Sequence, residues 1–248
     1  MADRWFEIAA VDHFWICRRF EVFRRIAGGL IADSRVMAEV GCGHGLLQLQ
    51  IEQAYGREVT GFDLNEIALK QNVSQRSTIS CYDICEKDST LREKFDLIFL
   101  FDVLEHIANE DGFLNALLYH LAPSGRLVVN VPAGMWAYSA YDVAAGHVRR
   151  YSVRSLRGVA ERNGLHVKNY TFWGLPLMPA LLLRKLWLLG DRDADDVISA
   201  GFDPRTRSLN QLLRIMSRCE PIPQTFLGTS LMAVFESGQQ ACLSCGAM

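Results

Sequence analysis

Short apolar segments alternate with amphipathic ones along residues 35–132, and this alternation constrains the fold more than any other feature of the sequence. The apolar segments have the length of strands, and the segments between them have helical spacing. Strands that alternate with helices form βαβ units with right-handed crossovers, and these build a parallel sheet. The segments predicted as strands are 35–40, 58–64, 78–84, 95–104 and 126–132, and those predicted as helices are 46–55, 65–73 and 111–122.

The alternation stops after Pro132 and resumes at a helix that Ser152 caps and Gly164 ends. A proline-interrupted apolar segment and a polar segment then look like an insertion before a last strand. The economical interpretation is one domain with a helical elaboration. We expect a single domain over 1–237, with an N-terminal helical cap at 1–34, strands at 165–172 and 229–237, a helical insertion at about 174–218, and a disordered tail at 238–248.

Composition excludes several classes of protein. Half of the 248 residues are hydrophobic and 22% are charged, which suits a globular protein with a sizeable core. The formal net charge of −2 argues against a nucleic-acid partner. The N-terminus lacks the layout of a signal peptide, and the scattered cysteines indicate reduced thiols, so we expect a cytoplasmic protein. The pair Cys242 and Cys245 lacks the second ligand pair of a zinc site, and we expect no metal.

The stretch "EVGCGHG" joins the first predicted strand to the first predicted helix. Its glycines, Gly41, Gly43 and Gly45, let the backbone approach a ligand beside a helix N-terminus. A dinucleotide-binding turn would have glycine where Leu46 stands. Glu39 would repel a pyrophosphate, but it would attract a ligand that carries an ammonium group.

Two more acids end the next two predicted strands. Asp63 can accept both hydroxyls of a ribose, and Asp83 can accept from an exocyclic amine. The alternative is that both carboxylates only cap helices. Three acids at three successive strand ends, beside a glycine turn, favour a nucleoside with a cationic tail.

The runs "VMAEVGCGHG", "VTGFDLN", "FDLIFLFDVLEHI" and "LAPSGRLVVNVP" resemble the class I S-adenosylmethionine-dependent methyltransferases. The resemblance covers about residues 35–135 and is to the small-molecule group, with domains of types 11 and 12, that includes quinone-biosynthesis enzymes. It implies an α/β, Rossmann-like, seven-stranded and mostly parallel sheet of order 3-2-1-4-5-7-6, with strand 7 antiparallel and helices on both faces. It also implies S-adenosylmethionine as the cofactor and a site made of Glu39, Gly41, Cys42, Gly43, Gly45, Asp63, Leu64, Asp83, Ile84, Phe101 and Asp102.

The loop "GHVRRYS" is the candidate for the chemistry. It resembles a stretch that follows the fifth strand in one branch of this superfamily, where it lies over the methyl-donor pocket. We expect His147 to accept a proton, because its unperturbed pKa is about 6.5. Arg149 or Arg150 would hold a polar part of the substrate. Tyr151, Trp136 and Trp15 would enclose it.

Two alternatives apply to the basic and imidazole side chains of this region. The arginines could instead pair with acids such as Glu105 and fix the loop. His106, in the turn "LEHI", could be a base, but hydrogen bonding within the turn is the favoured interpretation.

The leading function is transfer of a methyl group to an oxygen or nitrogen of a small molecule by in-line displacement. One alternative is a lipid or isoprenoid substrate, with residues 175–189 as a lid or membrane contact, although a core or dimer-interface helix is favoured. Another is a regulatory protein that binds the cofactor without catalysis. A nucleic-acid methyltransferase is disfavoured because "FDVL" stands where "DPPY" would. The protein is expected to be a monomer or homodimer.

Overall fold

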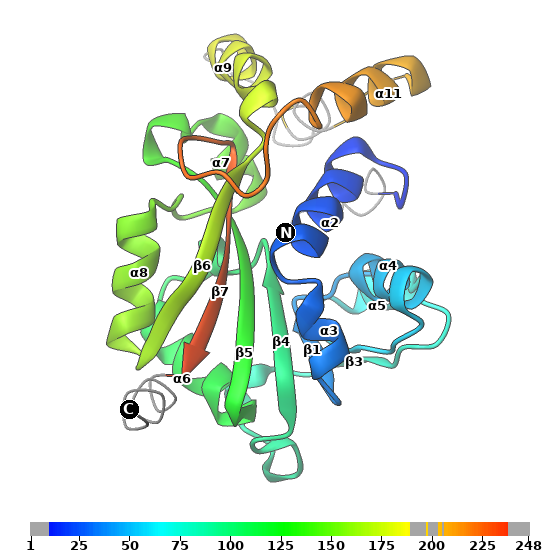
Figure 1. The fold of residues 1–248 in the computed structure, drawn as a ribbon, viewed down its shortest axis with the longest axis vertical. Coiled ribbons are helices and arrows are strands. Elements are labelled where there is room, and N and C mark those ends of the chain that lie inside the picture. The colour runs from blue at the N-terminus through cyan, green and yellow to red at the C-terminus, as the bar shows by residue number, and fades with distance from the viewer. Residues whose placement is uncertain (1–9, 189–196, 198–202, 205, 238–248) are drawn as a thin grey trace, which may run out of the picture.

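A computed structural model of the chain describes residues 10–188, 197, 203–204 and 206–237 (Figure 1). Its seven-stranded sheet has the order β3-β2-β1-β4-β5-β7-β6, which confirms the expected topology. Neighbours among the first five strands are parallel, and β7 is antiparallel to β5 and to β6. The strands are β1 (Met37–Val40), β2 (Thr60–Asp63), β3 (Ile79–Cys81), β4 (Phe95–Phe101), β5 (Leu121–Pro132), β6 (Leu165–Trp173) and β7 (Ser230–Ser237).

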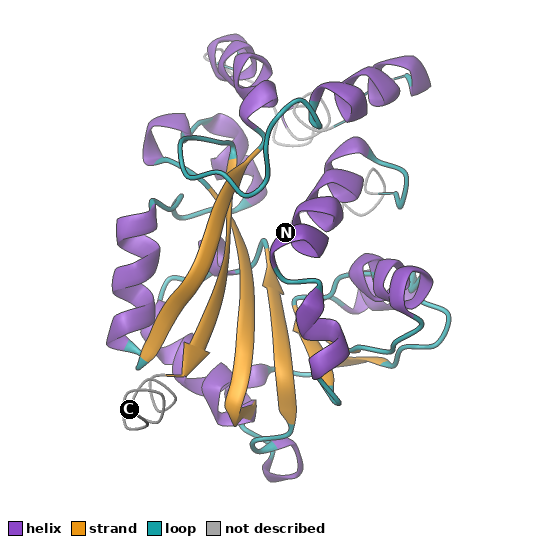
Figure 2. Cartoon of the chain, in the orientation of Figure 1, coloured by secondary structure: helices purple, strands orange, loops and turns teal. Residues whose placement is uncertain are grey.

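The helices lie around this sheet, as Figure 2 shows. They are α2 (Phe14–Ile26), α3 (Gly29–Asp33), α4 (Leu46–Tyr55), α5 (Glu66–Lys70), α6 (Glu110–His120), α7 (Ala140–Ala145), α8 (Val153–Arg162), α9 (Met178–Trp187) and α11 (Arg207–Met216). The predicted cap is confirmed, since Ser152 accepts from the Ser155 N–H, and Asn65 likewise accepts from the backbone N–H groups of α5. The helix α7 was not predicted, because six residues within a polar loop give no readable period.

Strand β4 separates the two halves of the core. Ile98 and Leu100 belong to a cluster that includes side chains of α6 and α8. Phe99 and Phe101 belong to a second cluster, with side chains of α2 and α4. Alternate residues of one strand therefore face opposite apolar layers, so the strand predicted within 95–104 is buried on both faces.

Strand β5 begins earlier than expected. Leu121 pairs with Phe95 before the register shifts, and Arg126 then pairs with Leu97. Residues 123–125, which lie between the predicted helix and the predicted strand, fall at this irregularity within β5. It leaves the carboxyl end of the strand where the sequence placed it.

The expected insertion contributes α9 and α11, which lie beyond the carboxyl ends of β4 and β5 (Figure 1). Helix α11 packs against α2, so the expected insertion meets the first described helix at this end of the sheet. The predictions for the tail at 238–248 and for the first part of the cap fall outside the described residues. Among the described residues, the helices are too short or too polar to cross a bilayer.

Candidate functional site

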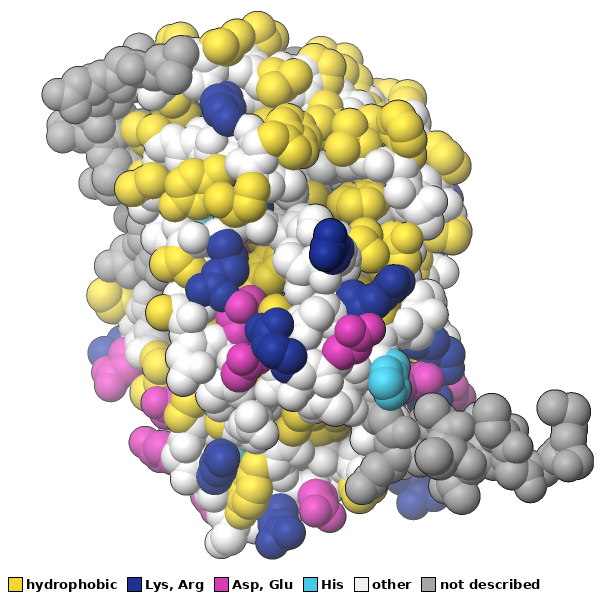
Figure 3. Space-filling view, turned by 90° about the vertical axis from the view of Figure 1, so that its left-hand side faces the viewer, with side chains coloured by type: hydrophobic (Ala, Val, Ile, Leu, Met, Phe, Trp, Pro, Cys, Tyr) yellow, Lys and Arg dark blue, Asp and Glu magenta, His cyan; other side chains and the backbone are white. Residues whose placement is uncertain are grey.

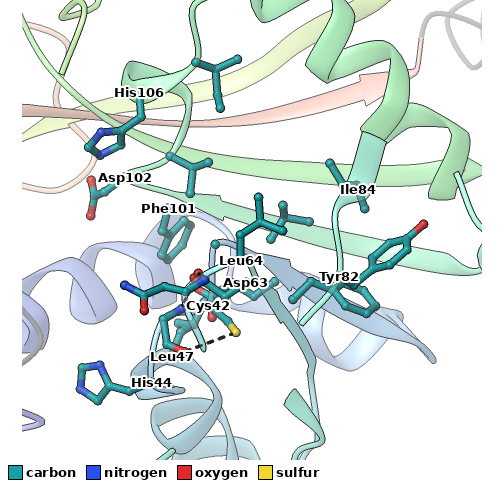
Figure 4. A pocket seen from close by; sticks show the side chains of 18 of the residues that line it. Cys42, His44, Leu47, Asp63, Leu64, Tyr82, Ile84, Phe101, Asp102 and His106 are labelled. Carbon is teal, nitrogen blue, oxygen red and sulfur yellow. Dashed lines mark hydrogen bonds between the residues drawn. The ribbon is translucent and has the colours of Figure 1, made fainter. Parts of the chain in front are cut away.

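Two adjoining cavities lie at the carboxyl ends of the parallel strands. The first has a volume of about 230 Å³ and lies over the glycine turn between β1 and α4 (Figure 4). Ten of the eleven expected cofactor residues line it, and Gly45 does not. The sequence therefore located this cavity from residues at the ends of β1 to β4.

The glycine turn needs glycine at two of the expected positions. Gly41 has a φ of +78°, and a Cβ atom there would come within 2.3 Å of Val103 Cγ2. Gly45 has a φ of +83° and is the N-cap of α4. A side chain at either position would strain the backbone, and at Gly41, which lines the first cavity, it would also collide with Val103.

Asp63 also accepts two backbone hydrogen bonds that the sequence did not predict. Its Oδ2 accepts from the Gly43 N–H at 2.6 Å, and its Oδ1 accepts from the Asn65 N–H at 2.8 Å. Asp63 thus ties the glycine turn to the start of α5 and also lines the cavity. Asp83 likewise lines the cavity while its Oδ1 accepts from the Cys85 N–H at 2.8 Å, so capping and lining occur together.

Glu39 is the most perturbed acid of the first cavity. Its side chain is buried, and Oε2 has no hydrogen-bond partner among the described residues. Burial raises its pKa to about 8, although the charge of Arg19 acts against this shift. A buried carboxyl group that lines a cavity with one unpartnered oxygen is suited to an ammonium group.

Arg19 and Asp102 form an ion pair that the sequence did not predict. Arg19, on α2, donates to Asp102 Oδ2 at 2.6 Å, and its guanidinium lies 5.2 Å from the centre of the Phe101 ring. Asp102 has a φ of +57°, and its Oδ1 accepts from Asn130 at 2.6 Å. Trp173 donates to Asn130 in turn. The polar Asn130 within an apolar strand was the readable signal of this network.

The second cavity has a volume of about 370 Å³, and it shares Asp102 and His106 with the first. Its walls come from α2, the loop after β5, α7, α9, α11 and the start of β7. Trp15, His147 and Arg150, which the sequence placed over the methyl-donor pocket, line this second cavity. The N-terminal cap and the loop after β5 therefore do meet there.

His147 and Arg150 converge on one buried carboxylate. Asp142, on α7, accepts from His147 Nδ1 at 2.9 Å and from Arg150 Nε at 2.7 Å. Burial acts to raise the pKa of Asp142, but the bonds from His147 and Arg150 outweigh it and the pKa is lowered. Arg150 is thus engaged with a protein acid, as the alternative interpretation held, although its partner is Asp142 and not Glu105.

Tyr151 and Trp136 do not line either cavity. Tyr151 is buried, and its hydroxyl donates to Leu104 O at 3.1 Å and to Glu110 Oε1 at 2.5 Å. Trp136 is 46% exposed. Arg149 pairs with Glu110. The bonds of Tyr151 and Arg149 fix the loop, and they give no support for the catalytic role expected of Tyr151.

His106 and Glu105 lie where the cavities join. His106 Nδ1 donates to Gly146 O at 3.1 Å, outside its own turn, and Nε2 is buried without a partner among the described residues. Burial, and after it the neighbouring His147, lowers the pKa of His106 to about 4. Glu105 is buried, and burial raises its pKa. His147 Nε2 lies 3.9 Å from Glu105 Oε1.

Comparison with known proteins identifies the family. A family model for a methyltransferase domain matches residues 7–169. A ubiquinone biosynthesis O-methyltransferase of Bradyrhizobium sp. (strain ORS 278) is 32% identical over 146 residues, which cover 56% of this chain and 55% of the relative. A pavine N-methyltransferase of Thalictrum flavum subsp. glaucum is 32% identical over 106 residues, which cover 40% of this chain and 30% of the relative.

The chain thus matches about half the length of the ubiquinone-biosynthesis relatives. The crystal structure of an S-adenosylmethionine-dependent methyltransferase from Archaeoglobus fulgidus shares the fold, with a TM-score of 0.55 at 19% identity, over 89% of this chain and 94% of that one. The chain therefore belongs to the methyltransferase domain family, within the class I superfamily that its motifs resemble.

Proposed function

We propose that the protein is an S-adenosylmethionine-dependent methyltransferase that methylates an oxygen of a small molecule. The observation that carries the proposal is the pair of cavities that meet at Asp102 and His106. One cavity holds the methyl donor and the other holds the acceptor. The reacting atoms meet at the boundary between them.

The residues of the first cavity fit S-adenosylmethionine. Glu39 offers a buried carboxylate to the methionine ammonium, and Arg19 offers a cation to the methionine carboxylate. Asp63 is placed for the ribose hydroxyls and Asp83 for the adenine amine. When bound, the sulfonium of the cofactor supplies the activated methyl group.

The protein aligns the acceptor and excludes water from the transfer. The bound cofactor would supply its methyl group to the acceptor oxygen in line, with the C–S bonding pair left on the departing sulfur and the acceptor's proton released to solvent. We place the acceptor's hydroxyl beside Glu105, His106 and His147, because these polar side chains lie at the boundary of the cavities. Arg150 acts by positioning the loop, since its partner Asp142 already balances its charge. An oxygen acceptor is supported by the O-methyltransferase named among the relatives.

An acceptor with a lipid or isoprenoid chain is a second candidate within the same class. Leu177, Leu181 and Leu213 line the acceptor cavity. On the outer side of α9, Leu183 is 68% exposed and Leu186 is 65% exposed. Figure 3 shows hydrophobic side chains gathered at the end of the molecule where α9 lies. This apolar wall and surface favour an acceptor with an apolar part.

The cofactor assignment is tested by calorimetric binding of S-adenosylhomocysteine. We expect Asp63→Ala to weaken binding about tenfold to a hundredfold, because one charged hydrogen-bonding group is lost. Asp63→Asn keeps the size of the side chain but can accept only one of the two backbone hydrogen bonds, so backbone NMR of Gly43 in both variants separates a lost ligand contact from a distorted turn. Glu161→Ala, at an exposed acid of α8, is the matched control and should bind like the parent protein.

Activity is tested with methyl-labelled S-adenosylmethionine and a panel of phenols and amines, each also offered with a prenyl chain. Labelled methyl ethers are the expected products. If the parent protein binds neither the cofactor nor its product, the proposal is wrong. If it binds them but transfers no methyl group to any acceptor, the regulatory alternative replaces the enzyme.

A further inference from the structure

Three potential metal ligands converge where the two cavities meet. Glu105, His106 and His147 each present one ligand atom, and these atoms lie within 4.8 Å of one another. The two imidazole rings are 4.8 Å apart between centroids and nearly perpendicular. Ligands at about 2.1 Å from a tetrahedral ion are about 3.4 Å apart, so small side-chain rotations close this group around an ion.

Hydrogen bonds orient both imidazole rings toward the centre of this group. His106 Nδ1 lies 3.1 Å from Gly146 O, and His147 Nδ1 lies 2.9 Å from Asp142 Oδ1. A carbonyl and a carboxylate accept hydrogen bonds, so each Nδ1 carries a proton, and a lone pair on Nε2 is available whenever the ring carries no second proton. Metal-binding histidines are held in this way by their second nitrogen.

Two atoms of the group are buried and unsatisfied. Glu105 is 1% exposed, and its Oε2 has no hydrogen-bond partner among the described residues. His106 Nε2 is also buried and has no hydrogen-bond partner among the described residues. A buried carboxylate without a partner is costly, and a cation at the centre of the group would satisfy both atoms.

We propose that Glu105, His106 and His147 bind one divalent transition-metal ion of the Zn²⁺ class. Two imidazoles and one carboxylate form a donor set that suits zinc and its neighbours, whereas Mg²⁺ prefers oxygen ligands. Three protein ligands leave a coordination position for another molecule. The sequence predicted no metal because Glu105–His106 and His147 are separated by forty residues and carry no spacing motif.

The role of the ion in catalysis extends the proposed function and rests on it. His106 and His147 also line the acceptor cavity, so the open position of the ion is available to a hydroxyl of the acceptor. A hydroxyl bound to a divalent cation ionises more readily, and its proton is released to solvent as the acceptor binds. His147 then serves as a ligand of the ion and not as the base expected from the sequence.

The test measures metal binding directly, without turnover. The full chain carries Cys242→Ser and Cys245→Ser, because those thiols could bind zinc themselves. After treatment with a chelator it is titrated with ZnCl₂ and CoCl₂ by calorimetry and absorption spectroscopy. We expect one equivalent to bind, with no thiolate-to-cobalt charge-transfer band.

Three variants separate this site from other histidines. Glu105→Gln and His147→Ala should each weaken metal binding by about a hundredfold or more. His166→Ala, at an exposed histidine of β6, should bind metal like the parent protein. Retained binding of S-adenosylhomocysteine in each variant shows that it is folded.

NMR of the parent protein, in which all three proposed metal ligands are present, tests the site even if a variant does not fold. Mn²⁺ should broaden the imidazole NMR signals of His106 and His147 before those of His166. Absence of binding, or equal binding by Glu105→Gln and the parent, overturns the metal site. If a chelator does not affect methyl transfer, the proposed function stands and the ion has no part in it. If the protein binds metal but transfers no methyl group, the metal site stands and the proposed function is wrong.

Discussion

Glu39 belongs to a strand whose other residues are apolar and buried. Its buried carboxylate is costly unless a cation comes close, and Arg19 reduces that cost without forming an ion pair with it in the described structure. The cofactor would bring the missing cation. Charge on Glu39 and occupation of the cavity are therefore linked.

This linkage predicts a pH dependence of cofactor binding. The pKa of Glu39 is about 8, so the carboxyl is mostly protonated at pH 6 and must lose its proton to hold an ammonium group. The affinity for S-adenosylhomocysteine should rise from pH 6 toward pH 8. It should fall again only at higher pH, where the ligand's own ammonium group loses its proton.

Glu39→Gln should bind more weakly and lose the rise between pH 6 and pH 8. Calorimetry across this range measures both proteins, and Glu161→Ala serves as the control for a lost surface charge. An identical rise in Glu39→Gln would show that another group titrates.

The sequence can reveal the role of a residue when the local pattern places that residue in the fold. It cannot do so when the role depends on a partner far along the chain. Asp63 and Asp83 were predictable because a carboxylate at the end of a parallel strand always reaches the same edge of the sheet. Arg19 was not, because it meets Asp102 across 83 positions and lies on a helix with three other arginines, from which the sequence does not distinguish it. His106 was assigned to its own turn, whereas it bonds to Gly146 in a distant loop.

At the scale of elements, α7 holds the loop after β5 in place. Its buried Asp142 binds His147 and Arg150 and also accepts from the Ser139 N–H at the start of the helix. The sequence showed the basic residues of the loop but gave no sign of the helix that supplies their acid. Six residues make fewer than two turns at about 3.6 residues per turn, so no repeat of apolar positions can be recognised.

Loss of the Asp142 charge should destabilise the fold strongly. Asp142→Asn leaves the buried Arg150 without its anion, and we expect the free energy of unfolding to fall by about 3 kcal/mol. Asp111→Asn breaks a pair with Arg162 in which both side chains are about half exposed, and it should cost less than about 1 kcal/mol. Urea unfolding followed by circular dichroism compares them. Equal costs for the two variants would contradict the buried ion pair.

At the scale of the whole molecule, the sheet and the two cavities differ in how far they could be predicted. The strand order follows from an alternating pattern and a family resemblance, and the first cavity is built from the ends of β1 to β4. The acceptor cavity is closed by α2, α9 and α11, which come from both ends of the chain. Nothing in their separate patterns indicates that they meet.

Because different residues line most of each cavity, one cavity can be altered without the other. Leu181, a buried residue of α9, lines only the acceptor cavity. Leu181→Trp should raise the KM for the best acceptor of the panel by about tenfold or more, equivalent to about 1.4 kcal/mol, with unchanged affinity for S-adenosylhomocysteine. Leu183→Trp, on the exposed side of the same helix, should leave both values unchanged. Weaker cofactor binding by Leu181→Trp would show that the cavities are not independent.

The helix α2 is shared by the two cavities. Arg19 faces one of them, Phe14 and Trp15 face the other, and α11 packs against the same helix. A displacement of α2 therefore opens both cavities together. An acceptor bound against α2 would hold this helix over the donor cavity. We expect the kinetic order of the reaction to follow from this arrangement: the donor enters first, the methylated product leaves first, and S-adenosylhomocysteine departs last.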